Sequence, residues 1–417
     1  MGAGTLAATE HAPARNPASR SQGPDLALLV AVIILIAFGL IMVYSASWDY
    51  SLAEYGEAAY MFMRQLLWLA LGLVIAALLT VFDYHHWRRL IVPAMGLTIV
   101  LLIAVLLLNE IRLGAKRSLY AGSYQPSELA KIVTIVYLSV WLYAKRRFLH
   151  DISLGLVPLG MILGVVGGLI YQQPDLSAAG TLLIMGGLLF FLAGGDLKQI
   201  GLLLVVAVVA GYLVVQVSPT GRVRVAEFLA GLKDPTQASY HVQRSYEAIV
   251  NGGVFGVGIG RAQSKLTGLP VPPTDSIYAV VVEELGLLGA VTLIGLYALV
   301  VWRGLIIARR APDMLGTLLA TGLVVWIGLE AGINMMVMVG LLPFAGNALP
   351  FVSAGGSNLV SSLAAVGILL NVSRQRGPWA ADDEDEEGRP DLAPSRVRRW
   401  HRRRRVSRAG GATSLES

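Results

Sequence analysis

The most informative residue of the chain is an aspartate at the border between a long polar segment and a new apolar run. Asp275 follows Pro-Val-Pro-Pro-Thr, and the sequence is apolar from Ile277 onward until Glu283. A carboxylate at the edge of a membrane helix is costly to keep, so such a residue is a candidate functional group. Asp275 is therefore our first candidate site residue.

Three positive side chains lie on the same side of the membrane, which we assign to the outside. Lys116 and Arg117 occupy a short loop, and Arg244 lies in the long segment 218–276. Arginine binds phosphate through two hydrogen bonds and lysine binds it as a point charge, so Lys116 and Arg117 indicate an anionic ligand. For the long segment a second explanation stays equally open, because long loops cross the membrane regardless of charge.

A polar motif opens one predicted span. It reads Gln-Pro-Ser-Glu-Leu-Ala-Lys, and its candidate site residues are Gln125, Ser127, Glu128 and Lys131. Proline suits the first turn of a helix, and a glutamate there interacts favourably with the helix dipole. Lys131 lies three residues after Glu128, so the two can pair on one face. Such a pair could be purely structural, or it could be kept for function.

Other polar residues flank or interrupt apolar runs. Gln173 and Asp175 join two predicted spans, where the aspartate could cap the next helix or bind a cation or a sugar hydroxyl. Glu330 and Asn334 lie four residues apart within a span, so they share a face that we expect to point inward.

A second acidic pair follows Asp275 along its predicted helix. Helical periodicity places Glu283 on the side of Asp275 and Glu284 on the opposite side. We expect Glu284 to be structural and to pair with a neighbouring helix.

The last span is preceded by a small-residue motif. Its candidate residues are Ser353, Gly355, Gly356 and Ser357. Backbone amides at such a helix start could bind an anion, and tight packing of the helix start is an equally good explanation.

The composition is that of a helical membrane protein. Of the 417 residues, 55% are hydrophobic and only 14% are charged, against about 25% charged in soluble domains. Apolar runs near the ~20 residues needed to cross a bilayer recur along the chain. The sequence predicts an all-α polytopic fold with about ten transmembrane helices. The predicted spans are 26–46, 62–82, 90–109, 126–145, 152–171, 178–195, 198–217, 277–302, 314–341 and 356–373.

Lysine and arginine set the expected orientation. Positive residues between spans two and three, four and five, six and seven, and eight and nine all fall on one side, which the positive-inside rule makes cytoplasmic. We expect a cytoplasmic tail at 1–25, a membrane domain at 26–374 with a large extracytoplasmic loop at 218–276 between helices seven and eight, and a disordered cytoplasmic tail at 375–417. That tail carries an acidic and a basic block, which favours contact with membrane lipid or a protein partner over nucleic acid.

Several chemistries are excluded. The chain has no cysteine, so disulfides and thiolate chemistry are impossible. No metal-ligand spacing and no Walker loop occur, so we expect no nucleotide cofactor. The glycine-rich stretch 252–260 follows no predicted strand, which argues against a dinucleotide site. Its glycines are more typical of re-entrant backbone packed tightly against a bundle.

The ordered set of motifs resembles the SEDS family of bacterial cell-wall polymerases, the FtsW, RodA and SpoVE type. The resemblance covers about residues 26–374. It departs from the usual family pattern at Ser118, Pro273, Glu330 and Ala354. The matching strings are Gly114 to Arg117, Gln125 to Lys131, Gln173 to Asp175, Asp234-Pro235, Ser245 to Gly260, Thr274-Asp275, Glu283 to Gly286, and Leu349 to Ser353 with Gly355 to Ser357.

The resemblance implies a ten-helix peptidoglycan glycosyltransferase that polymerises lipid II and releases undecaprenyl pyrophosphate, with a class B penicillin-binding protein as partner. It implies Asp275 as general base, cations such as Lys116, Arg117, Lys131 and Arg244 at the pyrophosphate, and a divalent cation, Mg²⁺ or Mn²⁺, as a further expectation. Ser245 also falls within the matching strings as a substrate-site candidate. A flippase of the lipid-linked precursor is the alternative, and a scaffold without activity is a third.

Overall fold

The computed structural model describes residues 23–108 and 125–375, and within these ranges the chain is helical and contains no strand. The all-α fold class is therefore confirmed. The α-helices are α1 (Leu26–Tyr55), α2 (Tyr60–Val81), α3 (Trp87–Leu108), α4 (Pro126–Lys145), α5 (Val157–Gln172), α6 (Leu176–Leu192), α7 (Leu197–Val217), α8 (Pro219–Gly231), α9 (Tyr240–Gly252), α10 (Ile277–Arg309), α11 (Met314–Met338) and α12 (Gly356–Arg374).

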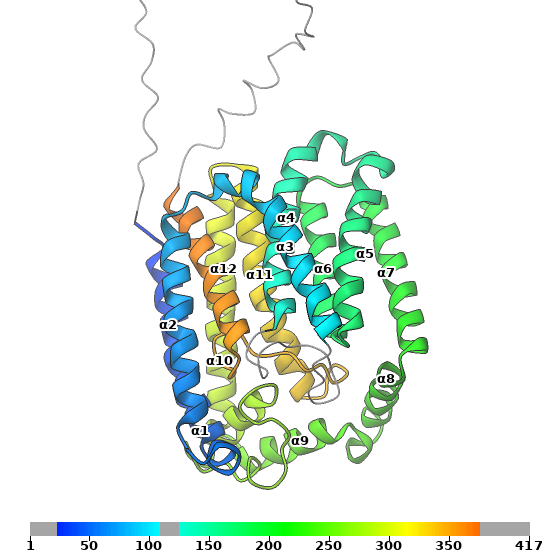
Figure 1. The fold of residues 1–417 in the computed structure, drawn as a ribbon. Coiled ribbons are helices and arrows are strands. Elements are labelled where there is room, and N and C mark those ends of the chain that lie inside the picture. The colour runs from blue at the N-terminus through cyan, green and yellow to red at the C-terminus, as the bar shows by residue number, and fades with distance from the viewer. Residues whose placement is uncertain (1–22, 109–124, 376–417) are drawn as a thin grey trace, which may run out of the picture. The chain divides into compact units, whose positions relative to one another are not determined.

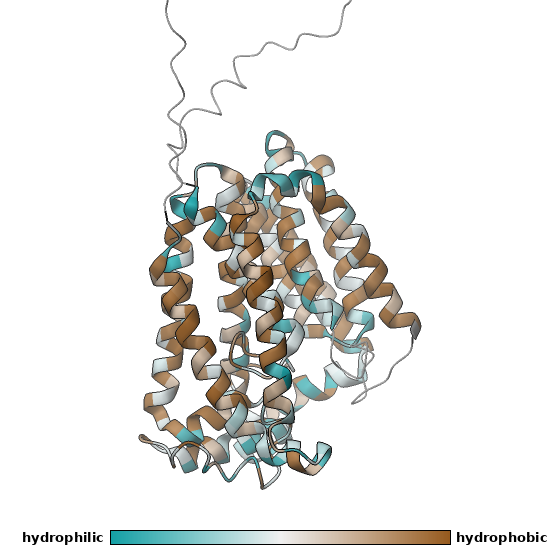
Figure 2. Ribbon diagram, turned by 60° about the vertical axis from the view of Figure 1, so that its left-hand side comes forward, coloured by the Kyte–Doolittle hydropathy of each residue, from teal (hydrophilic) through white to brown (hydrophobic). Residues whose placement is uncertain are grey.

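Most of these helices have the length and composition of membrane spans. In the part of the chain that the structure describes, nine helices are long and apolar enough to cross a membrane, and α6 is a shorter apolar helix of 17 residues. Hydrophobic residues dominate the long helices, and hydrophilic residues concentrate toward their two ends (Figure 2). This pattern follows from the cost of leaving polar groups unpaired in hydrocarbon.

Three elements differ from the sequence-based expectation, and one of them is α10, which ends at Arg309 and not at the predicted residue 302. Helix α1 continues to Tyr55, nine residues past the predicted end of its span, because the helix runs on through polar residues until Gly56 ends it in the left-handed conformation at φ 75°. The long segment 218–276 contains helix α8, which we did not predict. It also contains α9, which matches the predicted amphipathic stretch.

The ends of the membrane domain meet. The backbone N–H of Asp25, before α1, donates to Ser373 near the end of α12 (3.1 Å), and Arg303 of α10 forms an ion pair with Asp25 (2.5 Å). Figure 1 shows the start of α1 and the end of α12 at one end of the bundle, with α8 and α9 at the opposite end. The described ends of the chain therefore lie at one end of the bundle, and the helices of the segment 218–276 lie at the other.

The core lies around α11 and α12. Of their most hydrophobic windows, 72% and 78% of residues are buried, whereas none of the α7 window is buried. Close approach of α12 to α2 depends on small residues, because a Cβ at Gly367 would lie 2.6 Å from the backbone oxygen of Ala76. Helix α7 therefore presents its side chains to lipid, while α4, α11 and α12 position the polar interior.

Helix α10 is broken near its start. Gly286 adopts φ 68°, ψ −165°, which separates a short outer half from the long remainder. The glycine-rich stretch of the preceding loop pairs with the break: Val257 and Gly258 donate to the carbonyls of Glu283 and Glu284 (3.0 Å each), and Leu287 donates to Gly253 (3.0 Å). Tight backbone packing is confirmed at Gly252 and Gly256, where a Cβ would clash with the backbone of α10, whereas most of the stretch 252–260 is exposed and its re-entrant course stays a prediction.

Candidate functional site

A polar cluster forms where α4, α6 and α12 begin. The backbone N–H of Gln125 donates to Ser357 (2.8 Å), and its side-chain amide donates to Ser127 (2.9 Å) and to Asp175 (3.2 Å). Asp175 also accepts from the backbone N–H of Ala178 (3.2 Å) and so caps α6. The capping explanation for Asp175 is therefore confirmed, and its carboxylate also joins this cluster, whereas binding of a cation or a sugar hydroxyl stays a prediction.

One turn deeper, four side chains close a ring. Lys131 donates to one oxygen of Glu128 (2.9 Å) and to one oxygen of Glu330. The amide of Asn358 donates to the other oxygens, at 3.0 Å to Glu128 and 3.3 Å to Glu330. All four residues are more than nine-tenths buried. The predicted pairing of Glu128 with Lys131 is confirmed, and α11 supplies a second carboxylate.

The ring sets a strong energetic constraint. Removing one partner of a buried ion pair leaves an uncompensated charge and costs about 3–5 kcal/mol. The hydrogen bonds of Asn358 satisfy the carboxylate oxygens that Lys131 does not reach. Trp326 contributes an aromatic face 5.6 Å from the ammonium. These contacts together explain how charged side chains are retained inside an apolar bundle.

Asp275 lies in the turn before α10 and is half-buried. The segment after α11 holds this turn: Ala354 donates its N–H to the carbonyl of Pro273 (2.7 Å), and the Ser353 hydroxyl donates to the carbonyl of Thr274 (2.7 Å). The side-chain amide of Asn334 donates to the carbonyl of Asp275 itself (2.9 Å). The backbone that carries the carboxylate is therefore fixed on both sides.

Amide side chains connect this turn to the buried ring. Asn334 also donates to the carbonyl of Asn347 (2.7 Å), and Asn347 donates to the carbonyl of Glu330 (3.0 Å). Glu330 thus reaches Lys131 through its side chain and the turn of Asp275 through its backbone. Sequence reasoning placed Glu330 and Asn334 on an inward face, and it missed Asn347 and Asn358. Asn358 directly follows the predicted motif Gly355 to Ser357, whereas nothing in the sequence marks Asn347.

Other predicted site residues lie in different surroundings. Arg244 on α9 pairs with Glu247 (2.6 Å), and the buried hydroxyl of Ser245 donates to the carbonyl of Met338 (2.7 Å). The side chain of Gln173 donates to the carbonyl of Leu102 (3.1 Å). A Cβ at Gly356 would clash with the indole of Trp68, which favours the packing explanation for this glycine. Gly355, whose side chain is only a hydrogen, provides the N-cap position of α12.

Two predicted cations, Lys116 and Arg117, lie outside the described residues.

The second acidic pair, Glu283 and Glu284, binds the loop that precedes α10. Glu284 forms a buried ion pair with Lys265 (3.0 Å) and accepts from Ser45 of α1 (2.6 Å). Glu283 accepts from the backbone N–H groups of Gln263 (3.0 Å) and Ser264 (3.2 Å). The expected structural role of Glu284 is confirmed. The expectation that Glu283 faces the side of Asp275 assumed one helix through both residues, whereas Asp275 lies in the turn before α10, and the carboxylate of Glu283 binds the preceding loop.

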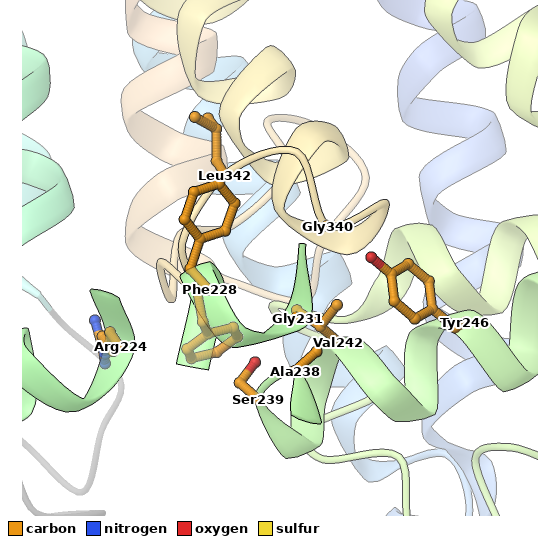
Figure 3. Close-up of a pocket in the computed structure, with 10 residues that line it drawn as sticks. Arg224, Phe228, Gly231, Ala238, Ser239, Val242, Tyr246, Gly340 and Leu342 are labelled. Carbon is orange, nitrogen blue, oxygen red and sulfur yellow. The ribbon is translucent and has the colours of Figure 1, made fainter. Parts of the chain in front are cut away.

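One pocket lies away from these residues. It encloses about 260 Å³, including space open to solvent, between α8, α9 and the turn after α11 (Figure 3). Its lining includes Phe228, Val242 and Tyr246, and it includes none of the predicted site residues. Beside it, His241 stacks on Phe344 with ring centroids 4.0 Å apart, and Arg224 lies over the same ring at 5.3 Å. Burial and the charge of Arg224 lower the pKa of His241 to about 4.

The described residues do not fit a metal centre. Residues 23–108 and 125–375 contain no group of three or more His, Asp or Glu side chains that could hold an ion. The oxygens of Glu128 and Glu330 are occupied by Lys131 and Asn358. The expectation of a divalent cation stays a prediction, and no step is derived through one.

A family model described as "Cell cycle protein", covering FtsW, RodA and SpoVE, matches residues 26–377. The chain belongs to this family. It is 39% identical over 354 residues to the "Probable peptidoglycan glycosyltransferase FtsW" of Trichlorobacter lovleyi, covering 84% of this chain and 93% of that one. It is 34% identical over 366 residues to the "Stage V sporulation protein E" of Bacillus subtilis, covering 85% and 98%.

Solved structures of the FtsW, RodA and SpoVE family have the same fold. The Rod shape determining protein RodA of Thermus thermophilus superposes with a TM-score of 0.63 at 25% identity, covering 85% of this chain and 98% of that one. A chain from a structure described as "Structural coordination of polymerization and crosslinking by a peptidoglycan synthase complex" gives a TM-score of 0.68 at 26% identity, covering 84% and 98%. The chain is thus a bacterial membrane protein of this family with a RodA-like fold.

Proposed function

We propose that this protein is a peptidoglycan glycosyltransferase that polymerises lipid II into glycan strands during cell division or cell elongation. One observation carries the proposal: Asp275 lies in a turn that hydrogen bonds tie to a buried ring containing Lys131. Relatives that are 39% and 38% identical are named probable peptidoglycan glycosyltransferases, which supports the same activity here.

In the proposed reaction a sugar 4-hydroxyl attacks the anomeric carbon that carries the lipid pyrophosphate. The new carbon–oxygen bond forms as the bond to the pyrophosphate oxygen breaks, and undecaprenyl pyrophosphate leaves as an anion. The hydroxyl proton passes to Asp275, which acts as general base. An α-linked donor then gives a β-linkage by a single inversion, chemistry for which a carboxylate base is suited.

Positive side chains have the second role in the proposed reaction. Charge grows on the pyrophosphate as the bond breaks, and cations at fixed positions stabilise it most effectively in a site that excludes water. Lys131 is the described residue best suited to this role, because it lies in the ring connected to Asp275. Lys116, Arg117 and Arg244 remain proposed contacts of the same anion.

The proposed topology places the active site outside the cytoplasm. The positive-inside rule assigns both termini and the charged tail to the cytoplasm and the segment 218–276 to the opposite side. The meeting of Asp25 with Ser373 supports termini on one side. A class B penicillin-binding protein is the proposed partner, which is consistent with the coordinated polymerisation and crosslinking of the peptidoglycan synthase complex.

The test is polymerisation of purified lipid II by the purified protein, with and without the partner transpeptidase. We expect polymer from the wild type and none from Asp275→Ala or Asp275→Asn, with unchanged melting temperature and partner binding. Asp151→Ala is the matched control, because Asp151 is an exposed cap before α5. Normal polymer from the Asp275 variants would remove this residue from the role of base. Movement of lipid II across vesicles without polymer would instead support a flippase.

A further inference from the structure

The buried ring carries unequal charge. It contains one ammonium, from Lys131, and two carboxylates, from Glu128 and Glu330. An ammonium has three hydrogens, and the two carboxylates accept two of them. A phosphate that approached Lys131 would therefore compete with both glutamates for the same positive charge.

The two glutamates are not equivalent. Glu128 belongs to α4, the helix of Lys131, three residues away, so their pairing is a local property of one helix. Glu330 belongs to α11 and reaches Lys131 across the bundle. Its backbone carbonyl accepts from Asn347, which in turn accepts from Asn334, the residue that holds the carbonyl of Asp275. Glu330 is thus the member of the ring that connects the lysine to the turn of the candidate base.

We propose that Glu330 is a positioning residue that limits how strongly Lys131 attracts the diphosphate. Its carboxylate fixes the ammonium within the ring and also offsets part of the positive charge. The diphosphate product therefore binds weakly enough to be released after each transfer. This inference rests on the proposed function and adds to it a residue that sets affinity for the leaving group.

The physical basis is the low dielectric of the site. A negative charge several ångströms from a bound anion is only weakly screened inside a protein, so its removal strengthens anion binding substantially. Glu330→Gln removes this charge and keeps the size of the side chain. Its amide oxygen can still accept from Lys131, and its amide nitrogen replaces the oxygen that accepts from Asn358, so the ring loses the charge and this one hydrogen bond.

The experiment measures inhibition of lipid II polymerisation by undecaprenyl pyrophosphate, together with equilibrium binding of that diphosphate to the detergent-solubilised protein. For Glu330→Gln we expect the inhibition constant and the KM for lipid II to fall together by roughly tenfold. Glu330→Asp, which restores the charge, should return the inhibition constant toward the wild-type value. A purely structural role would instead lower the amount of active protein and kcat while KM stayed unchanged.

Glu284→Gln is the matched control, because Glu284 is also a buried carboxylate paired with a lysine, Lys265, outside the ring. It should leave diphosphate binding unchanged. A second test combines Glu330→Gln with Lys131→Gln, where the gain in binding should disappear.

Three results would overturn the inference. The first is unchanged affinity in a folded Glu330→Gln protein, the second is an equal gain in Glu284→Gln, and the third is a gain that persists without Lys131. Wild-type protein that binds the diphosphate and yet makes no polymer would contradict the proposed function alone. Wild-type protein that does not bind it would overturn both.

Discussion

Asn334 holds the backbone of Asp275: its side-chain amide, fully buried on α11, donates to the carbonyl oxygen of Asp275 at 2.9 Å. The second amide hydrogen goes to the carbonyl of Asn347 at 2.7 Å. The side-chain NH2 group thus donates to two segments beside the candidate site, the turn of Asp275 and the segment after α11. We infer that Asn334 holds these two segments together through its two hydrogen bonds.

Asn334→Ala should reduce polymerisation by lowering kcat more than it changes KM. The substitution leaves two partly buried carbonyls without this donor, and an unsatisfied group costs about 1–3 kcal/mol when it is fully buried. The turn of Asp275 then loses its fixed geometry, and small displacements of a catalytic group can reduce rates about 100-fold. Steady-state kinetics with lipid II and the melting temperature measure the two effects separately.

Asn371→Ala is the control for that prediction. Asn371 is also buried, and its amide donates to the carbonyl of Thr80 (2.9 Å) at the other end of the bundle. It should lower the melting temperature by a similar amount and leave kcat unchanged. Equal loss of kcat in both variants would show that Asn334 acts only through stability.

Gly286→Ala should destabilise the membrane domain. The backbone at Gly286 has φ 68°, which is unfavourable for any residue with a side chain, and a Cβ there would clash with the backbone of Val254 and Gly256. We expect a loss of about 1–3 kcal/mol or failure to fold. Gly295→Ala, in the same helix with open space around the position, should be neutral or slightly stabilising. Thermal unfolding in detergent compares the two variants, and equal melting temperatures would contradict the role of the break.

Acid should weaken the contact between α9 and the turn after α11. Burial, and then the charge of Arg224, lowers the pKa of His241 from 6.5 to about 4. The unfolded chain therefore binds a proton more readily than the folded one between these values. Stability from this residue is complete above about pH 6.5 and is lost as the pH falls toward 4.

The expected loss is about 1–2 kcal/mol, less than full linkage would give because the ring is partly exposed to solvent. The measurement is the melting temperature of the wild type and of His241→Phe, which keeps the stack on Phe344. The difference between the two proteins should change as the pH falls through this range. Parallel curves would exclude His241 as the cause.

The membrane helices could be predicted from the sequence because apolar runs near twenty residues have few alternatives. Even so, the apolar pattern gave the wrong end for α1, since the helix continues through polar residues to Gly56. Helix α8 was missed because its sequence has no clear apolar periodicity. The break at Gly286 could not be predicted either, because a single glycine in an apolar run does not interrupt the helical pattern. The break is recognised only from the backbone conformation of Gly286 and from the hydrogen bonds of the preceding loop.

The candidate site could be predicted only in part. Glu128 and Lys131 were paired correctly because their spacing within one helix fixes their distance. The second carboxylate on Lys131, from Glu330, comes from a helix nearly 200 residues later in the chain, and no local pattern encodes such a meeting. The same reason explains why Asn358 and Asn347 were missed, since their roles are set by which helices pack together.

The break in α10 has a consequence for how the protein is made. The carbonyls of Glu283 and Glu284 accept hydrogen bonds from the backbone N–H groups of Val257 and Gly258, which precede them in the chain. Those two residues are synthesised before their acceptors, so the contacts form only after the first turns of α10 have been made. The stretch around Val257 must therefore fold back against a helix that is made after it, and the turn bearing Asp275 lies in the segment enclosed by this contact.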